Sequence, residues 1–124
     1  MSATGPLRVM LVEDHIAFRQ ALAILLSADP ELEVVSEAGS LAEAREALGG
    51  GGLDVALLDL ALPDGDGREL VGELRRSSPG VRIMVLSAAL WGGEAEEVLG
   101  ADAVFDKVRS YWTIAEEVRR LAGR

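Results

Sequence analysis

The chain contains no cysteine, few aromatic residues and no apolar run long enough to span a membrane. The lack of cysteine excludes disulfides and thiolate metal sites. Aromatic residues make up only 4% of the chain, so we expect a core of Ala, Val, Leu and Ile. Residues 1–6 lack the charged start and apolar segment of a signal peptide. We therefore expect a cytoplasmic protein without membrane contact.

Basic residues are also scarce. Lys and Arg number 12 against 21 Asp and Glu, and the formal net charge is −9. Nucleic-acid binding needs clustered Lys and Arg to neutralise phosphates, so we do not expect this chain to bind nucleic acid directly. An acidic pocket, by contrast, suits a hard cation.

Five short apolar runs alternate with helical patterns along the chain. We expect strands at 7–12, 32–36, 55–59, 81–86 and 103–105, and helices at 15–28, 41–48, 66–76, 93–99 and 111–121. Runs that are apolar throughout are typical of parallel strands covered on both faces. The pattern predicts an α/β fold, a (βα)5 doubly wound five-stranded parallel sheet with the flavodoxin-like strand order 2-1-3-4-5. We expect it to form one domain over residues 1–124.

Two of the helices have recognisable starts. His15 is expected to begin the first helix. Ser40 is expected to cap the second, with Glu43 three residues on completing a capping box.

Charged and hydroxyl residues follow the predicted strands. Reading off the carboxyl ends of strands one, three, four and five gives Glu13, Asp14, Asp59, Ser87 and Lys107. In a doubly wound sheet the functional crevice lies at these ends. Clustered carboxylates repel, so they need a cation or shifted pKa values. Mg²⁺ suits carboxylates together with a phosphate oxygen, and a buried Asp can attack phosphorus. The set therefore indicates phosphoryl transfer, which mainly needs positioning and electrostatics.

The order of these residues resembles the receiver domain of two-component response regulators over nearly the full chain. The matching residues are Glu13-Asp14-His15, Asp59 with Pro63 and Gly67, Ser87-Ala88, and Lys107 with Phe105. Residues 18–22 most resemble receivers joined to helix-turn-helix DNA-binding output domains.

The resemblance implies a phosphorylation-switched signalling module rather than a conventional enzyme. Asp59 would accept a phosphoryl group from a sensor histidine kinase. Mg²⁺ or Mn²⁺ would be held by Asp14, Asp59 and the backbone carbonyl of Ala61, with Glu13 acting through water. Ser87 and Lys107 would bind the phosphoryl oxygens. Ser87 and Phe105 would switch the face formed by the fourth helix, fifth strand and fifth helix.

The resemblance also concerns partners. A homodimer could form through that same face or through helices one and five. Transcription would be regulated through a DNA-binding domain outside this chain.

The chain departs from the family after Ser87. The segment from there to Gly100 is short and contains Gly92-Gly93, which weakens a helix. Val108 follows Lys107, where proline is common in the family.

Simpler interpretations remain for single residues. Asp14 could cap the first helix, and Asp59 could form a structural ion pair with Lys107. Phe105 could be ordinary core. Trp91, Tyr111 and Trp112 form either an exposed aromatic patch or simple packing of the last helix.

Two other functions compete with the signalling switch. A hydrolase with an aspartyl-phosphate intermediate needs an acid two residues after the nucleophile, and Ala61 stands there. A degenerate receiver would act as a phosphorylation-independent interaction module. A calcium loop at residues 64–67 is excluded because Arg68 occupies the next ligand position.

Overall fold

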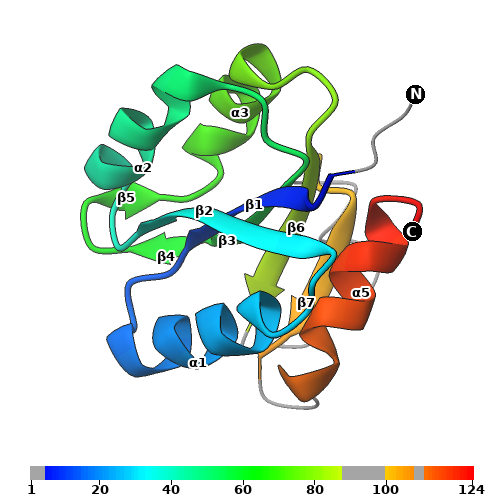
Figure 1. Cartoon of the computed structure of the whole chain (residues 1–124). Helices are drawn as coiled ribbons and strands as arrows, with labels where there is room; N and C mark the ends of the chain where they lie inside the picture. The colour runs from blue at the N-terminus through cyan, green and yellow to red at the C-terminus, as the bar shows by residue number, and fades with distance from the viewer. Residues whose placement is uncertain (1–4, 88–99, 108–110) are drawn as a thin grey trace.

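Five parallel strands form a central sheet with helices on both faces (Figure 1). The computed structural model describes residues 5–87, 100–107 and 111–124. The strands are β1 (Leu7–Val12), β2 (Leu32–Ala38), β3 (Val55–Asp59), β6 (Arg82–Ser87) and β7 (Ala103–Asp106). Their order is β2-β1-β3-β6-β7, and every neighbouring pair is parallel. Since β6 and β7 are the fourth and fifth strands of this sheet along the chain, the predicted order 2-1-3-4-5 and fold class are confirmed.

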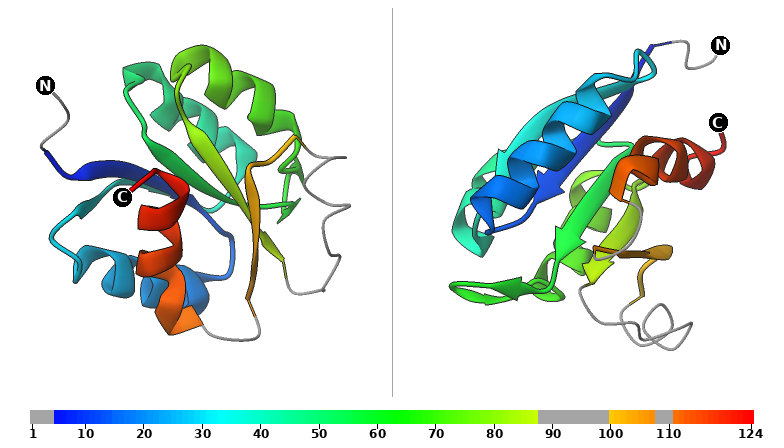
Figure 2. Two further views of the ribbon diagram at one scale, coloured as in Figure 1. Left: turned by 90° about the vertical axis from the view of Figure 1, so that its right-hand side faces the viewer. Right: turned by 90° about the horizontal axis from the view of Figure 1, so that it is seen from below.

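The helices form one layer on each face of the sheet (Figure 2). They are α1 (Ile16–Ser27), α2 (Leu41–Ala47), α3 (Glu69–Ser77) and α5 (Ile114–Leu121), with short 3-10 turns η1 (Leu48–Gly50) and η2 (Tyr111–Thr113). α1 and α5 cover one face, and α2 and α3 cover the other. The helix predicted at 93–99 lies outside the described residues. None of the helices in the described ranges is long and apolar enough to cross a membrane.

Side chains of β1 alternate between the two layers of core. Val9 and Leu11 pack with the buried residues of α1 and α5, whereas Met10 and Val12 pack with those of α2 and α3. This alternation follows from the two-residue period of a strand. It buries β1 on both faces from residue 9 to residue 12, as the continuous apolar run predicts, whereas Arg8 is exposed.

The second strand departs from that prediction. Glu33 and Glu37 on β2 are exposed, and the strand continues to Ala38. β2 lies at the edge of the sheet, where burial on both faces is incomplete. The prediction that every strand is apolar throughout is therefore wrong for β2.

The predicted helix starts are confirmed. The Nδ1 atom of His15 accepts a hydrogen bond from the backbone N–H of Phe18 and caps α1. Ser40 Oγ accepts from the N–H of Glu43, and the Glu43 carboxylate accepts from the N–H of Gly39. Because His15 is the cap, the interpretation of Asp14 as the cap of this helix is wrong.

The segment after Asp59 differs from the prediction. The third helix begins at Glu69 rather than at Asp66, because residues 61–66 form a small antiparallel hairpin of β4 (Ala61–Leu62) and β5 (Gly65–Asp66). The Asp66 side chain accepts from the N–H of Arg68 and pairs with its guanidinium, which favours a turn at this point.

Other boundaries shift by one to three residues. The first helix occupies 16–27, the second ends at 47, the third ends at 77, the fourth and fifth strands are 82–87 and 103–106, and the last α-helix begins at 114 after a 3-10 turn.

Candidate functional site

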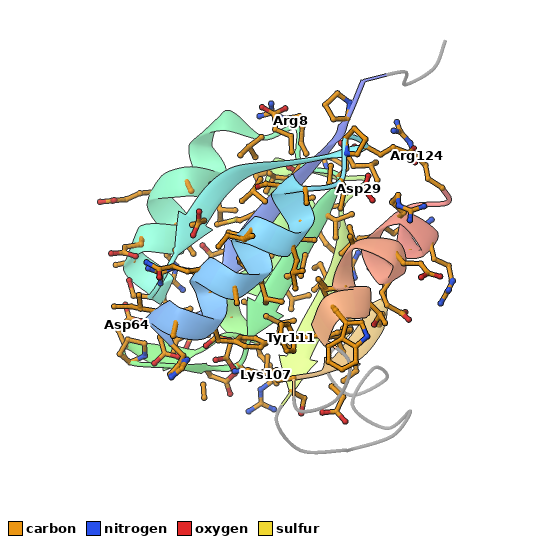
Figure 3. All side chains as sticks on the ribbon, turned by 60° about the horizontal axis from the view of Figure 1, so that its bottom comes forward. Arg8, Asp29, Asp64, Lys107, Tyr111 and Arg124 are labelled. Atoms are coloured by element: carbon orange, nitrogen blue, oxygen red, sulfur yellow. The ribbon has the colours of Figure 1, made fainter. Side chains whose placement is uncertain are left out.

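The predicted site residues gather at the carboxyl ends of the strands. Glu13 and Asp14 follow β1, Asp59 ends β3, Ser87 ends β6 and Lys107 follows β7. The backbone N–H of Lys107 donates to the carbonyl of Ser87 at 2.8 Å, which joins the last two strand ends. Lys107 and Asp64 lie at this end of the domain, whereas Arg8 lies at the opposite end (Figure 3). The parallel topology thus brings together residues far apart in the chain, as the sequence predicts.

Three carboxylates form the centre of the site. Oxygen atoms of Glu13, Asp14 and Asp59 lie within 4.8 Å of one another. Glu13 is 0% exposed and Asp59 is 7% exposed, whereas Asp14 faces solvent. The site therefore combines two buried acids with one that opens to water.

Lys107 supplies positive charge to the two buried acids. Its Nζ atom lies 2.8 Å from Glu13 Oε1 and 3.4 Å from Asp59 Oδ2. Burial alone would lower the pKa of the Lys107 ammonium. Its close contact with the Glu13 carboxylate and the negative charge of Asp59 outweigh burial and hold that pKa above its usual value. Lys107 is therefore fully charged at neutral pH.

Glu13 is the most buried of the acids. Its Oε2 accepts from the backbone N–H of His15 at 3.0 Å, and the Nζ of Lys107 approaches its Oε1 without the alignment of a good hydrogen bond. Burial raises the pKa of the Glu13 carboxyl, against the opposing effects of Lys107 and the His15 N–H, and repulsion from Asp59 raises it further. Oε1 therefore has acceptor capacity left for another positive group.

Asp59 is held by the loop that follows it. Its Oδ1 accepts from the backbone N–H of Ala61 at 3.1 Å, and its Oδ2 faces Lys107. Gly67 packs directly against the Asp59 and Leu60 backbone, where a side chain would overlap it. Asp59 is thus fixed in place. Its other carboxylate oxygen, Oδ2, faces the Lys107 ammonium, which also pairs with Glu13.

Two contacts near the site were missed from the sequence. The Nζ of Lys107 lies 5.0 Å from the ring centroid of Phe18, which comes from α1. Asp64 accepts hydrogen bonds from the backbone of Leu41 and Ala42. Phe18 belongs to the apolar pattern of its helix, and Asp64 lies in a turn-forming stretch, so both have ordinary sequence explanations. The sequence signal for the Phe18 contact is its spacing: Phe18 lies four residues, about one helical turn, after the predicted site residue Asp14.

A family comparison identifies this arrangement. The model of the response regulator receiver domain matches residues 9–107, which is most of the chain. The chain belongs to the response regulator receiver domain family.

Individual relatives of this receiver domain support the same family assignment. It is 48% identical over 81 residues to the DNA-binding transcriptional activator DevR/DosR of Mycobacterium tuberculosis, covering 65% of this chain and 37% of that protein. It is 33% identical over 123 residues to a protein-glutamate methylesterase/protein-glutamine glutaminase of Agrobacterium fabrum, covering 93% of this chain and 35% of the relative. The matches thus span little more than a third of these two relatives.

A solved structure shows the same fold. A chain in the crystal structure of the P1 domain of CheA3 in complex with CheY6 from R. sphaeroides superposes with a TM-score of 0.81 at 28% identity. The superposition covers 97% of this chain and 99% of that chain. The fold of this receiver domain is therefore that of receivers solved elsewhere.

The acidic cluster of this receiver fits a divalent cation. Its donors are carboxylate oxygens, the ligands that Mg²⁺ prefers, and Glu13 Oε1 is buried without a well-aligned hydrogen bond. Receiver domains bind Mg²⁺ at such an acidic pocket.

The proposed switch residues have different surroundings. Phe105 is buried in the core under α1 and α5, as the interpretation of Phe105 as core predicts. Ser87 is half-buried at the end of β6. Their switching roles remain predictions. The departures predicted for residues 88–99 and at Val108 lie outside the described residues.

The aromatic patch is present in part. Tyr111 and Trp112 stack edge to face with ring centroids 5.6 Å apart, and Trp112 is 66% exposed. Both are therefore surface residues rather than packing of α5. The third proposed member, Trp91, lies outside the described residues.

Proposed function

We propose that this receiver is a phosphorylation switch in which Asp59 is the phosphoacceptor. The observation that supports this most is the placement of Asp59: a buried carboxylate at a strand end, beside two further acids and one ammonium. A structural ion pair between Asp59 and Lys107 would not need Glu13 and Asp14 in the same cluster.

The reaction transfers a phosphoryl group from a phosphohistidine. A carboxylate oxygen of Asp59 forms a bond to phosphorus as the phosphorus–nitrogen bond breaks, and the imidazole leaves with the electron pair. Glu13, Asp14, Asp59 and the backbone carbonyl of Ala61 would hold Mg²⁺ or Mn²⁺. The bound cation supplies positive charge that stabilises the transferring phosphoryl oxygens.

Lys107 and Ser87 act on the transferred group. Lys107 Nζ already lies 3.4 Å from Asp59 Oδ2, so it needs only a small movement to reach a phosphoryl oxygen on that atom. Ser87 ends the neighbouring strand, and its hydroxyl can donate to another phosphoryl oxygen. Both residues would then report phosphorylation to β6 and β7, where Phe105 lies.

The phosphorylated form would be a signalling state rather than a step of enzymatic turnover. Ala61 occupies the position at which a phosphohydrolase needs a second acid, so proton donation to a leaving alcohol has no group there. The methylesterase relatives are enzymes by name, but the matched part of each is about a third of its length.

The partners follow from the family. Receivers act with histidine kinases or phosphotransfer domains, and we infer that a histidine kinase is the donor here. The similarity to DevR/DosR supports output through a DNA-binding domain. For a homodimer through helices one and five, α1 offers Ile16 and Ile24, which are 60% and 70% exposed.

Acetyl phosphate labelling tests the proposal. We expect intact-mass spectrometry to show one added phosphoryl group in the presence of Mg²⁺ and none after EDTA treatment. Asp59→Asn should abolish labelling, whereas Glu33→Gln, an exposed change on β2 with the same loss of charge, should not. Labelling that persists in Asp59→Asn, or its absence from the unsubstituted protein, would overturn the assignment.

A further inference from the structure

The loop that follows Asp59 folds into the hairpin of β4 and β5. Its register pairs Ala61 with Asp66 and Leu62 with Gly65. A hairpin of two such short strands is not stable by itself in water. Contacts with the rest of the domain must therefore fix its position.

Asp64 supplies one of these contacts from the tip of the hairpin (Figure 3). Its Oδ1 accepts from the backbone N–H of Leu41 at 2.8 Å, and its Oδ2 accepts from that of Ala42 at 3.1 Å. These donors belong to the first turn of α2, where no intrahelical acceptor is available. The N–H of Leu41 is the main cause that lowers the pKa of Asp64, so the carboxylate is the bound form.

The start of α2 already has a cap of its own. Ser40 Oγ accepts from the N–H of Glu43, and the Glu43 carboxylate accepts from the N–H of Gly39. These two bonds use only residues 39–43. Asp64 pairs two further N–H groups of the same turn, those of Leu41 and Ala42, and it does so from the hairpin, so its bonds join the two elements.

Shape reinforces this link. Gly65 lies against the Leu41 side chain so closely that an added Cβ atom would overlap the Leu41 Cδ1. Leu41 itself is buried in the core between the sheet and α2. Two adjacent residues of the hairpin tip thus contact α2: Asp64 by hydrogen bonds and Gly65 by close packing.

The base of the same hairpin contacts Asp59. The N–H of Ala61 donates to Asp59 Oδ1, and the N–H of Gly67 donates to the carbonyl of Leu60 at 2.8 Å. A shift of the hairpin would move both the N–H and the carbonyl of Ala61 relative to Asp59.

We propose that Asp64 is a positioning residue for the Asp59 site. By tying the hairpin to α2, it keeps the Ala61 N–H on the Asp59 carboxylate and keeps the Ala61 carbonyl where a cation ligand is needed. The consequence for the cation rests on the proposed function. The placement of Ala61 does not, because it can be measured without metal or phosphate.

Backbone amide exchange and Mg²⁺ titration, both followed by NMR, test the inference on three variants. Asp64→Ala removes both acceptors, Asp64→Asn keeps one of them, and Glu46→Gln removes one negative charge from α2 as a control. In Asp64→Ala without metal, we expect faster exchange of the Ala61 N–H as well as those of Leu41 and Ala42. We expect its Mg²⁺ affinity to fall by about tenfold, the low end for groups that orient metal ligands from outside. Asp64→Asn should lie between, and Glu46→Gln should match the unsubstituted protein.

The outcomes separate this inference from the proposed function. Faster exchange confined to Leu41 and Ala42, with Mg²⁺ affinity within twofold of the original, would make Asp64 a helix cap only and overturn the inference. If the unsubstituted protein bound no Mg²⁺, the proposed function would fail, and exchange of the Ala61 N–H would still decide whether Asp64 places it. If Asp64→Ala does not fold, Asp64→Asn gives the same readouts.

Discussion

The Nζ atom of Lys107 lies 2.8 Å from Oε1 of Glu13, a side chain with no exposed surface. The same ammonium reaches Asp59 at 3.4 Å, so one positive charge compensates two buried acids. Such a cluster is costly to break at the lysine, because removal of Lys107 leaves two buried acids without their positive partner.

Replacing Lys107 should therefore destabilise the domain. We expect Lys107→Met to lower the free energy of unfolding by about 2–4 kcal/mol in EDTA, somewhat less than for a fully buried pair because Lys107 is partly exposed. Saturating Mg²⁺ should recover part of the loss by replacing the missing charge. Urea denaturation with and without Mg²⁺ measures both effects, and Lys107→Arg, which keeps the charge, is the control. A Lys107→Met protein as stable as the original would contradict this account of the site.

Replacing Asp14 should have the opposite effect on stability to replacing Lys107. Asp14 is the exposed member of the cluster, so its loss costs no buried interaction and relieves repulsion from its neighbours. We expect Asp14→Asn to be at least as stable as the original protein in EDTA but to lose most of the stabilisation that Mg²⁺ provides. For the original protein, that gain should be about 2.7 kcal/mol when Mg²⁺ is at 100 times its dissociation constant. Denaturation curves in both conditions test this, with Glu33→Gln as a charge-matched control; an unchanged Mg²⁺ gain would remove Asp14 from the ligand set.

The fold and the outline of this site could be predicted from the sequence because both depend on local patterns. An apolar run gives a strand, and the residue that ends the run lies at the strand's carboxyl end, so Asp59 and Lys107 could be placed. Parallel order then brings these ends together. The β4–β5 hairpin could not be predicted this way, because its residues form no apolar run and Asp66 looks like the start of a helix.

Which side chains contact one another within the site could not be predicted, because no sequence pattern encodes distances in three dimensions. On the sequence alone, three carboxylates are candidates to pair with Lys107. The structure shows that the buried Glu13 carboxylate lies nearest to its Nζ atom. Asp64 meets α2 across 23 residues of chain, a contact fixed by how α2 packs on the sheet. Phe18 packs against the buried core of α1 and α5, and the face of its ring also meets Lys107.

The Phe18 ring should stabilise the Lys107 ammonium of the folded protein by a measurable amount. A cation over an aromatic face is stabilised by about 0.5–1 kcal/mol at partly exposed sites. We expect a double-mutant cycle of Phe18→Leu and Lys107→Met to show a coupling energy of this size in urea denaturation. Phe18→Tyr keeps an aromatic face, so its cycle with Lys107→Met should show a coupling energy near zero, because that substitution does not remove the contact. Coupling near zero in the Phe18→Leu cycle would mean that the contact is only geometric.

The hydrogen bonds of Asp64 should make part of the stability depend on pH. Its pKa is lowered in the folded state, chiefly by the Leu41 N–H, so its stabilising effect is fully present above the unfolded pKa, which is near 3.8. That effect is lost as the pH falls through the lower, folded pKa. We therefore expect the original protein to be more stable than Asp64→Asn at pH 7 and the difference to shrink below about pH 4. Thermal melts of both proteins across this range measure the difference. A gap that widens on acidification would contradict the sign of the shift.

Gly67 should be the most restrictive position in the loop after Asp59. A Cβ atom there would overlap the Asp59 carbonyl oxygen and lie against the Leu60 Cα, and both are backbone atoms that cannot rotate away. We expect Gly67→Ala to cost about 2–3 kcal/mol in urea denaturation, as overpacking of a closely packed site does. Gly80→Ala is the matched control, since a Cβ at Gly80 meets nothing within 4 Å. That control should be neutral or stabilising by about 0.5 kcal/mol, because alanine restricts the unfolded chain. Equal stabilities for the two variants would show that the backbone around Asp59 yields easily, and Asp59 could not then be held as rigidly as phosphoryl transfer requires.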